Sequence, residues 1–383
     1  MKDGDCMKFA ILGFGTVGRG AYLVAKDSEN LEVSKILVRT LRQDMIDFVS
    51  APENDKIFTK YIQDILSDES IELVVESIGG TEVAHDYVLQ CLNAGKHVVT
   101  PNKNLVSAYY DELQGAASKN GVEFRYTPTA GGGIPWLFNL MRTKRCDQIL
   151  EIRGIVNGTC NYILDAMHRD NVSYQDILKK AQELGYAEAD PSADVDGIDT
   201  LRKTVISTNI AFDTVITEDE VPCFGISTIK SQDIDWFKEN GFVCKLMMNA
   251  KFDGKKLSAY VEPTLFTKDA LEASVGTNNN LITLVGKSIG TQSFYGQGAG
   301  MLPTGESVIQ DVIDIKDGVK MQKSSKNIKL NIDNSSETRD YYVRSGKKVG
   351  IMKSLLVEEM HELAKECKDK GVEVFFAAMP DCE

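Results

Sequence analysis

A glycine-rich turn directly after a short apolar run constrains the fold of this chain more than any other feature. Residues 8–12 have the composition of a buried strand, and a helix is expected from the turn to Lys26. The turn consists of Gly13, Phe14, Gly15, Thr16, Val17 and Gly18. Glycine permits a tight turn and a close approach of the backbone to a pyrophosphate, and the helix N-terminus favours negative charge. The motif therefore predicts a dinucleotide site, although any tight strand–helix turn also selects glycine.

The residue after the second expected strand bears on the identity of the dinucleotide. Sites that bind NAD have an acidic residue about 20 positions after the glycine motif, where it hydrogen-bonds the ribose. Here the strand expected at residues 33–38 is followed by Arg39. Because a guanidinium group suits a 2′-phosphate, Arg39 favours NADP, and NAD stays possible. The alternative is that Arg39 lies on a solvated loop.

The spacing of apolar runs divides the 383 residues into three parts. Residues 1–130 alternate buried strands with amphipathic helices, which predicts an α/β domain with a Rossmann-type doubly wound parallel sheet. Residues 131–317 predict an α+β substrate domain with an antiparallel or mixed sheet, whose last part, about 296–317, returns to the cofactor domain. Residues 318–383 predict a linker at 323–340 and a βαβ piece with strands at 340–344 and 372–378 and a helix at 351–370. Since one βαβ unit cannot bury both faces, this piece is expected to dock on the body or on a partner subunit.

The composition excludes several classes of protein. Forty-three Lys and Arg against fifty-six Asp and Glu give a net charge of −13, which argues against nucleic acid or an anionic membrane as a general partner. There is no run of 18 apolar residues and no signal-peptide pattern. Eight scattered cysteines without a CxxC pair, and four histidines at no ligand spacing, argue against structural zinc. We therefore expect a cytoplasmic protein with reduced cysteines.

An aspartate and a lysine four residues apart are the first candidates for proton transfer. Asp199 and Lys203 share one face of an expected helix, and on spacing alone they are an ordinary exposed ion pair. Upstream, however, carboxylates crowd the segment from Glu188 to Asp199, and they would repel one another unless they face a cation or water. The spacing is not that of an EF-hand loop. A lysine held among carboxylates and desolvated by a substrate can exchange a proton with a hydroxyl group.

Further segments could contact a ligand. Lys103 follows Pro101 and Asn102 at the carboxyl end of an expected parallel strand, where ligands bind in open α/β sheets. The glycine loops at residues 131–135 and 296–304 suit either a bound ligand or a crossover between domains. Cys160 and His168 have no base partner beside them in the sequence, so we expect core packing or ordinary hydrogen bonding for both.

In combination these motifs resemble homoserine dehydrogenases over roughly residues 7–315. The matching segments, in the family's order, are Gly13-x-Gly-x-Val-Gly18, Pro101-Asn-Lys103, Gly131-Gly-Gly-Ile-Pro135, Asn157-Gly-Thr-Cys-Asn-Tyr-Ile-Leu164, Gly185-Tyr-Ala-Glu-Ala-Asp-Pro191, Asp194-Val-Asp-Gly-Ile-Asp199 with Lys203, and Gly298-Ala-Gly300-x-x-Pro-Thr304. The resemblance implies interconversion of L-homoserine and L-aspartate 4-semialdehyde in the biosynthesis of threonine, methionine and isoleucine.

The resemblance also implies roles for single residues. Lys203 is expected to donate and accept the proton of the substrate oxygen, and Lys103 to contact cofactor and substrate. Glu188 and Asp199 are expected to bind homoserine, chiefly through its ammonium group. The dinucleotide is expected to contact Thr16, Val17, Gly185 and Gly300. The second domain resembles a dimerisation platform, which implies a homodimer or a dimer of dimers.

The sequence departs from the family at two places. Members usually have a glutamate that, with carbonyl groups of the following loop, surrounds a sodium ion; here Thr127 takes its position. The backbone oxygens of Ala130, Gly132 and Ile134 could still coordinate, so we expect a monovalent cation to bind weakly or not at all. Members inhibited by threonine carry a complete βαββαβ ACT domain after the catalytic part. Residues 340–378 resemble only part of one, so we expect threonine inhibition to be weak or absent.

Other classes of function are open to a chain of this pattern. One is a catalytically silent Rossmann-type sensor of a dinucleotide or an amino acid, against which the intact set of Lys103, Glu188, Asp199 and Lys203 argues. Another is a different amino-acid dehydrogenase of the same architecture. A thiol-dependent semialdehyde dehydrogenase is disfavoured, because no cysteine lies in a nucleophile setting.

Overall fold

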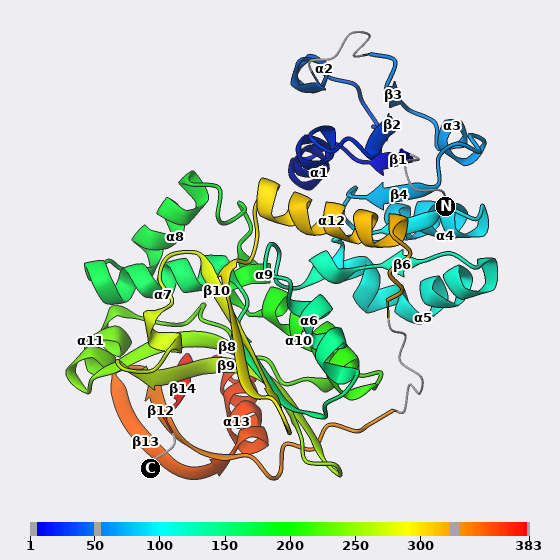
Figure 1. Ribbon diagram of the computed structural model, residues 1–383. Coiled ribbons are helices and arrows are strands. Elements are labelled where there is room, and N and C mark those ends of the chain that lie inside the picture. The colour runs from blue at the N-terminus through cyan, green and yellow to red at the C-terminus, as the bar shows by residue number, and fades with distance from the viewer. Residues whose placement is uncertain (1–5, 50–54, 322–328, 381–383) are drawn as a thin grey trace. The chain divides into compact units, whose positions relative to one another are not determined.

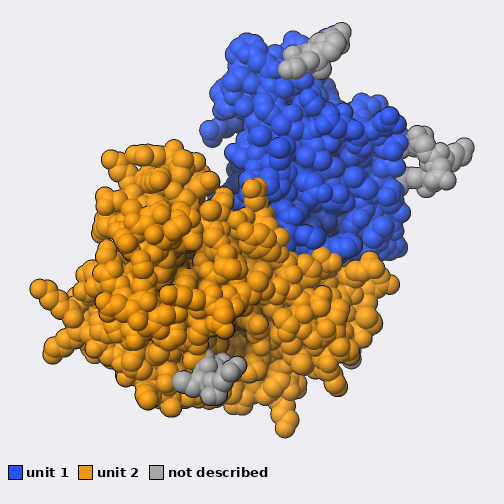
Figure 2. Space-filling model, turned by 60° about the vertical axis from the view of Figure 1, so that its left-hand side comes forward, with its two compact units in different colours: residues 1–138, 299–323 blue, residues 139–298, 324–383 orange. Residues whose placement is uncertain are grey.

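The computed structural model describes residues 6–49, 55–321 and 329–380, and the chain forms two compact units. Unit 1 comprises residues 1–138 and 299–323, and unit 2 comprises residues 139–298 and 324–383 (Figure 2). The boundary at residue 138 lies inside helix α6 (Trp136–Lys144). Within the described ranges, none of the helices combines the length and the apolar character that crossing a membrane requires.

Unit 1 is built on a sheet of six parallel strands (Figure 1). In spatial order these are β3 (Phe58–Thr59), β2 (Leu31–Leu37), β1 (Met7–Leu12), β4 (Leu73–Glu76), β5 (His97–Val99) and β6 (Phe124–Arg125). The strand order reverses between β1 and β4, and dinucleotides bind beside the carboxyl ends of the strands at such a reversal. The prediction of a doubly wound parallel sheet is confirmed.

The helices of unit 1 bury one stripe each against this sheet or against one another. They are α1 (Thr16–Lys26), α2 (Gln43–Val49), α3 (Gln63–Leu66), α4 (Glu82–Asn93), α5 (Lys103–Asn120), the 3₁₀ turn η1 (Thr127–Thr129) and α12 (Met301–Lys316). α12 packs closely on α1, since a Cβ atom on Gly20 would lie 1.9 Å from the carbonyl oxygen of Met301. Val308 and Val312 of α12 are buried in the same core as Phe9 of β1. The core of unit 1 therefore includes a helix far along the chain.

Unit 2 contains a mixed sheet of eight strands (Figure 1). In spatial order these are β11 (Gly290–Gln297), β10 (Asn279–Gly286), β7 (Ile149–Ile155), β8 (Phe242–Phe252), β9 (Leu257–Thr267), β14 (Val374–Ala378), β12 (Thr338–Ser345) and β13 (Lys348–Leu356). All neighbours are antiparallel except β14 and β9. The hairpin expected around Asp253-Gly254 joins β8 to β9, and its turn is closed by the Asp253 carboxylate, which accepts from the amides of Lys255 and Lys256.

Helices pack on both faces of this sheet. The helical segments of unit 2 are α7 (Gly158–Asp170), α8 (Tyr174–Glu183), α9 (Ser192–Val195), α10 (Ile198–Phe212), η2 (Glu218–Glu220), α11 (Ser231–Glu239), η3 (Glu272–Ser274) and α13 (Val357–Asp369). α7, α10 and α11 cover one face, where they pack on β8, and α13 packs on the other face, where His361 contacts Glu262 of β9 at 3.1 Å. α10 is buried along most of its length, including the charged residues Asp199 and Lys203. Because buried charges require compensating partners, Asp199 and Lys203 make α10 a candidate for the functional site.

The C-terminal segment differs from the βαβ piece that the sequence predicts. The helix begins at Val357 rather than near residue 351, because residues 348–356 form β13, which pairs with β12. Nor is residue 323 to residue 340 a simple linker: residues 322–328 lie outside the described ranges, but Asn334 is buried and its side chain accepts from the amide of Ala259 at 3.0 Å. The segment is therefore an extension of the unit 2 sheet with the order ββαβ.

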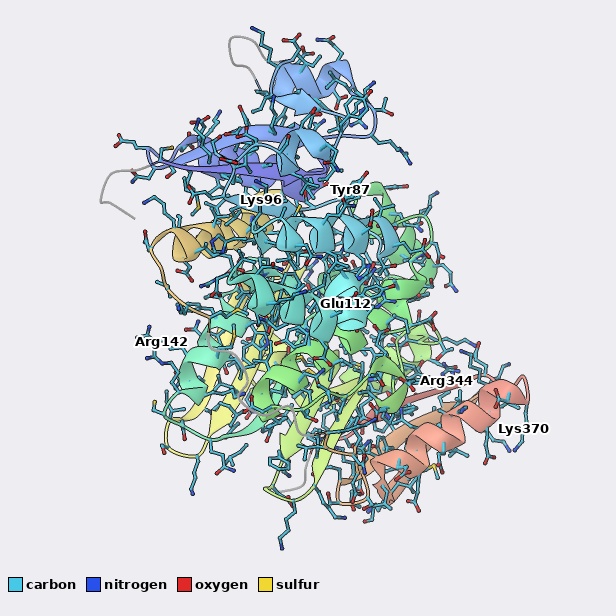
Figure 3. All side chains as sticks on the ribbon, turned by 90° about the vertical axis from the view of Figure 1, so that its right-hand side faces the viewer. Tyr87, Lys96, Glu112, Arg142, Arg344 and Lys370 are labelled. Carbon is cyan, nitrogen blue, oxygen red and sulfur yellow. The ribbon has the colours of Figure 1, made fainter. Side chains whose placement is uncertain are left out.

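Buried charge ties this extension to the rest of unit 2. Arg344 of β12, labelled in Figure 3, is fully buried; its guanidinium donates to Asp233 Oδ1 of α11 at 2.7 Å and to Glu373 Oε1 at 2.9 Å. The hydroxyl of Tyr342 donates to the same Asp233 oxygen at 2.7 Å. Breaking one partner of a buried ion pair is costly, so these contacts fix the extension on the sheet.

Candidate active site

The glycine turn of unit 1 has the geometry that a dinucleotide phosphate requires. Gly13 has φ +93°, and a Cβ atom there would lie 2.6 Å from the Ser77 carbonyl oxygen. A Cβ atom on Gly18 would lie 2.3 Å from the Gly13 carbonyl oxygen. In contrast, the position of a Cβ atom on Gly15, the N-cap of α1, has no described atom within 4 Å. The first and third glycines are thus required by the protein's own packing, while Gly15 leaves space for a phosphate at the N-terminus of α1.

The other residues of the turn contribute in different ways. Phe14 is 2% exposed and packs edge-on against Tyr22 and Phe58, so its side chain belongs to the core and only its backbone can face a ligand. Val17 packs partly buried against the same core. Thr16 is exposed at the first position of α1.

Arginines gather after β2. Arg39 is exposed two residues beyond the end of β2 at Leu37. Arg42 donates to Asp44 Oδ1 at 2.9 Å, and Arg19 contacts the other oxygen of Asp44. These two guanidinium groups hold the pKa of the Asp44 carboxyl well below its usual value. The carboxylate of Asp44, five residues after Arg39, is therefore already bound by arginine.

The carboxyl ends of β4 and β5 are joined by a buried carboxylate. Glu76 is fully buried; it accepts from the Ile78 amide at 2.8 Å and from Thr100 Oγ1 at 2.6 Å. Burial raises the pKa of Glu76, and these hydrogen bonds oppose the rise. Asn102 caps α5 by accepting from the Leu105 amide at 3.2 Å, so Lys103 is the first residue of that helix. Lys103 thus lies at the ligand-binding edge of the sheet, half-buried, as the sequence indicates.

In the loop after β6, two of the backbone oxygens expected as candidate sodium ligands already accept hydrogen bonds. The Gly132 carbonyl oxygen accepts from Ser307 Oγ at 2.6 Å, and the Ile134 carbonyl oxygen accepts from the Trp136 amide at 2.7 Å. Ala130 is buried beside them, and Thr127 supplies no carboxylate. Among the residues that the structure describes, no group of three or more His, Cys, Asp or Glu could hold a metal.

A buried carboxylate, that of Asp311, lies next to this loop, and its cationic neighbour is Arg125. Asp311 Oδ2 accepts from the Thr127 amide at 3.1 Å. Arg125 lies 3.2 Å from Asp314 and 4.0 Å from Asp311. Burial raises the pKa of Asp311 to about 7, because it outweighs the attraction of Arg125.

The candidate proton-transfer site lies in unit 2, where α10 faces the end of β7. The Lys203 ammonium donates to Asp199 Oδ2 at 2.7 Å and to the Val156 carbonyl oxygen at 2.6 Å. Lys203 is 7% exposed and Asp199 is 6% exposed. The sequence left an exposed helix pair as the alternative, and the observed burial excludes it. A lysine in this setting can donate a proton to a substrate oxygen or accept one from it.

Asn157 is a residue of this site to which the sequence assigned no role. Its Nδ2 donates to Asp199 Oδ2 at 2.8 Å and to Asp194 Oδ1 at 2.7 Å, while its Oδ1 accepts from the Cys160 amide at 2.8 Å and caps α7. Asp194 lies on α9, so one amide connects three helices. The motif that begins at Asn157 was visible in the sequence, but the partners lie 37 and 42 residues further on.

Thr159 was also missed, and it holds the loop that contains the predicted substrate ligand. Its Oγ1 donates to the Tyr186 carbonyl oxygen at 2.6 Å. Beyond Tyr186, Glu188 is exposed and its carbonyl oxygen accepts from Gln182 Nε2 at 3.0 Å. Gly185 is exposed with φ +75° and has open space at its Cβ position. The side chain of Glu188 is therefore accessible to a substrate.

The predicted residues fall into two groups, one in each unit. Unit 1 holds the glycine turn, Arg39, Lys103 and Gly300, the last with φ +131° at the N-cap of α12. Unit 2 holds Gly185, Glu188, Asp199 and Lys203, of which Asp199 and Lys203 are in direct contact.

Cys160 and His168 have the structural roles expected of them. Cys160 is 1% exposed, and burial, followed by the charges of Asp194 and Asp199, raises the pKa of its thiol well above the usual value. His168 Nε2 accepts from the Cys244 amide at 3.0 Å, and burial lowers its pKa to about 4. A protonated thiol and a neutral, engaged imidazole are not a nucleophile and its base.

Sequence and structure comparisons agree on one family. The family profile described as "Homoserine dehydrogenase, NAD binding domain" matches residues 13–127, and "Homoserine dehydrogenase" matches residues 135–313. The homoserine dehydrogenase of Bacillus subtilis is 34% identical over 324 residues, 82% of this chain and 74% of that protein. That of Corynebacterium glutamicum is 40% identical over 324 residues, 81% and 72%.

Solved structures with the same fold include a homoserine dehydrogenase from Thiobacillus denitrificans. It has a TM-score of 0.85 at 28% identity and covers 98% of this chain and 99% of its own. One from Staphylococcus aureus at pH 6.0 has a TM-score of 0.76 at 26% identity, covering 99% and 100%. A hyperthermophilic archaeal homoserine dehydrogenase in complex with NADPH shares the fold at 23% identity and a TM-score of 0.69 over 83% of this chain and 99% of its own.

The parallel sheet with its glycine turn, together with a buried lysine–aspartate pair, defines an oxidoreductase that uses a nicotinamide nucleotide. The profiles cover most of the chain, and several relatives exceed 30% identity over more than two thirds of it. The chain belongs to the homoserine dehydrogenase family. It interconverts L-homoserine and L-aspartate 4-semialdehyde, a step of amino-acid biosynthesis.

Proposed function

We propose that Lys203 transfers the proton of the homoserine dehydrogenase reaction. The observation that carries this role is the burial of its ammonium group 2.7 Å from Asp199 Oδ2 and 2.6 Å from the Val156 carbonyl oxygen. When bound, the nicotinamide ring accepts the hydride from the carbinol carbon of homoserine. Neutral Lys203 takes the hydroxyl proton in that direction, and its ammonium form returns a proton to the aldehyde oxygen in the other. Glu188 and Asp199 supply carboxylates for the substrate ammonium, and Lys103 contacts cofactor and substrate.

Replacing the lysine tests this role. In Lys203→Ala we expect kcat to fall by about 10²–10⁴-fold, the usual contribution of a positioned acid or base, with little change in the KM of the cofactor. Lys179→Ala, on the exposed face of α8, is the matched control and should keep wild-type kinetics. A folded Lys203→Ala enzyme that keeps most of its kcat would remove Lys203 from the mechanism.

We propose NADP as the preferred cofactor. Arg39 is exposed two residues after β2, and the carboxylate of Asp44 is bound by Arg19 and Arg42, so it is not free to bind a ribose. Arg39→Ala should lower kcat/KM for NADP by about tenfold and leave that for NAD nearly unchanged, in line with the loss of one charge-assisted hydrogen bond. A wild-type enzyme that uses both cofactors equally well would contradict the proposal.

We further propose that turnover does not depend on sodium. The support is Thr127 in place of the glutamate and the hydrogen bonds already made by two loop carbonyls. Rates in sodium and in tetramethylammonium salts of equal ionic strength should agree within about a factor of two, since ionic screening is then the same. Weak threonine inhibition stays a prediction as well, and millimolar threonine in the same assay tests it.

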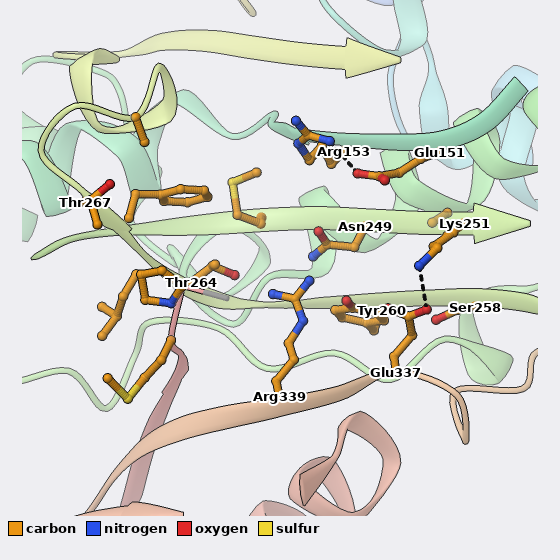
Figure 4. A pocket seen from close by; sticks show the side chains of 17 residues that line it. Glu151, Arg153, Asn249, Lys251, Ser258, Tyr260, Thr264, Thr267, Glu337 and Arg339 are labelled. Atoms are coloured by element: carbon orange, nitrogen blue, oxygen red, sulfur yellow. Dashed lines mark hydrogen bonds and ion pairs between the residues drawn. The ribbon is translucent and has the colours of Figure 1, made fainter. Parts of the chain in front are cut away.

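A homodimer through the face of the unit 2 sheet opposite α7, α10 and α11 is the assembly we propose. That face carries a pocket of about 420 Å³ lined by the central strands and by the C-terminal extension (Figure 4). Its ion pairs join Glu151 to Arg153 and Glu337 to Lys251. Asn249 Nδ2 and Thr264 Oγ1 are buried there without a hydrogen-bond partner.

A second copy is the occupant that this charge pattern favours. The chain as a whole carries −13, which opposes self-association, but the pocket lining combines three cationic side chains (Arg153, Lys251 and Arg339) with two carboxylates (Glu151 and Glu337), so charges of opposite sign can pair across a two-fold axis. Light scattering should give twice the chain mass, and Arg153→Glu should shift the protein towards monomer. A monomeric wild-type protein at micromolar concentration would contradict this. A cytoplasmic location is part of the same proposal, supported by seven described cysteines that are all free.

A further inference from the structure

We propose that Asn157 is a positioning residue that holds Asp199 and Lys203 in the geometry of proton transfer by bridging Asp199 to Asp194. This inference rests on the proposed role of Lys203 and extends it to a residue that touches neither reacting atom. Asn157 follows Val156 at the end of β7, so adjacent residues of one short segment bind both members of the pair. The Val156 carbonyl accepts from Lys203, and the Asn157 amide donates to Asp199.

The amide of Asn157 is used completely by its three contacts. An asparagine side chain offers two N–H donors and one acceptor oxygen. Both donors bind carboxylates, Asp194 at 2.7 Å and Asp199 at 2.8 Å, and the oxygen caps α7. Because each group has one partner of the correct polarity, the orientation of the side chain is fixed. Any rotation that kept the cap would lose a carboxylate.

The bridge by Asn157 holds two carboxylates, Asp194 and Asp199, close together, and Asp199 is buried against Lys203. Asp194 and Asp199 belong to different helices, and without a donor between them they would repel across a medium of low polarity. Asp199 Oδ2 accepts from both Asn157 and Lys203, so the amide withdraws part of the negative potential that stabilises the ammonium form. The thiol of Cys160, whose backbone amide Asn157 caps, is subject to the charges of Asp194, Asp199 and Lys203 and to the nearby thiol of Cys223, so these ionisable groups form one cluster. Of these, the two cysteine thiols stay neutral, since their pKa values are raised.

Two substitutions separate the bridge from the helix cap. Asn157→Asp and Asn157→Ser both keep an oxygen that can cap α7, since Asp, Ser and Asn are equally good N-caps. Ionised Asp has no donor, and Ser has a single donor on a shorter side chain, so neither variant can bridge the two carboxylates. Ser173→Ala is the matched control: it removes the cap of the neighbouring helix α8, where Ser173 Oγ accepts from the Asp176 amide at 3.3 Å, and it should leave kcat unchanged.

For homoserine oxidation we expect kcat to fall by about 10²-fold in Asn157→Ser and further in Asn157→Asp. The pH at which kcat/KM reaches half its maximum should rise by about one unit, because uncompensated carboxylates favour the ammonium form of Lys203. Circular dichroism of both variants should match that of Ser173→Ala, and the melting temperature of Asn157→Ser should stay close to that of Ser173→Ala.

A loss of kcat with an unchanged pH profile would show a merely structural role and overturn the proposal, and so would wild-type kinetics in both variants. Lys203→Ala distinguishes a failure of the proposed role of Lys203 from a failure of the proposed role of Asn157. If that variant keeps its activity, the proposed function fails; if it is inactive while the Asn157 variants are normal, only the present inference fails.

Discussion

The two candidate sites of this enzyme are built from different materials. In unit 1 the phosphate turn is backbone, shaped by glycines whose missing side chains leave either close packing, at Gly18, or open space, at Gly15. In unit 2 the proton-transfer site is made of side chains from α7, α9 and α10, joined by one asparagine amide. A backbone site depends on local conformation, whereas a side-chain site depends on contacts between distant segments. The two should therefore respond differently to pH and to substitution.

The largest expected difference is in the response to acid. Asp311 of unit 1 has a pKa raised to about 7, so the folded chain binds its proton at a higher pH than the unfolded chain does. Protonation of Asp311 therefore increases the free energy of unfolding as the pH falls from 7 towards 4. His168 of unit 2 has a pKa lowered to about 4, so the unfolded chain binds the proton first, and stability is lost as the pH falls from 6.5 to 4. The pKa shifts correspond to changes in the free energy of unfolding of about 4 kcal/mol for Asp311 and about 3 kcal/mol for His168, with opposite signs.

Urea unfolding at several pH values checks this contrast. Relative to wild type, Asp311→Asn should remove a stabilisation by acid, and His168→Gln should remove a destabilisation by acid. Hydrogen exchange resolved by segment should place the first effect in unit 1 and the second in unit 2. If both substitutions changed the pH dependence of the free energy of unfolding in the same direction, the predicted difference between the two units would be wrong.

A smaller effect distinguishes the glycines of the turn. Gly15→Val fills the open space, so the KM of the cofactor should rise about a hundredfold or more, close to 2.7 kcal/mol, while stability and the KM of homoserine stay near wild type. Gly18→Ala should instead lower the melting temperature, because its Cβ atom would lie 2.3 Å from the Gly13 carbonyl oxygen. Steady-state kinetics and thermal melts measure both. Similar behaviour of the two variants would show that Gly15 is also a packing residue.

The smallest effect concerns the loop that carries Glu188. Thr159→Val removes the 2.6 Å hydrogen bond to the Tyr186 carbonyl, which is worth about 0.5–1.5 kcal/mol, so the KM of homoserine should rise about 2–10-fold. kcat should change by less than about twofold, because Lys203 is untouched. Thr208→Val on α10 is the matched control, since Thr208 Oγ1 is buried without a described hydrogen-bond partner. A kcat effect as large as the KM effect would contradict the separation of binding from proton transfer.

The sequence predicted the backbone conformation around the glycine turn and the start of α5 well, because the signals for both are local. The turn at Gly13 and the N-terminal position of Lys103 depend on neighbours within a few residues, and both lie where they were expected. The bridge at Asn157 could not be predicted, because its amide could equally have capped α7 and faced water. Its two carboxylate partners are brought in by the packing of α9 and α10.

The same distinction explains the error in the C-terminal extension. The sequence predicts that the helix begins at residue 351, but residues 351–356 belong to β13 (Lys348–Leu356), an outer strand that is mostly exposed and pairs with β12 alone. An exposed edge strand has no alternation of buried residues to reveal it. The pairing of β12 with β14, and of β14 with β9, is what fixes this arrangement.

The position of α12 in the core of unit 1 has a consequence for how the protein is made. Val308 and Val312 cover apolar side chains of β1, yet residues 139–298 are synthesised between them and the first part of unit 1. At about 5–20 residues per second, the ribosome needs roughly 10–30 s for that stretch. During this interval the nucleotide-binding sheet has emerged without its last covering helix, so its apolar surface is open to chaperones or to other nascent chains. The unit that is made first is thus completed only after most of the second unit has been synthesised.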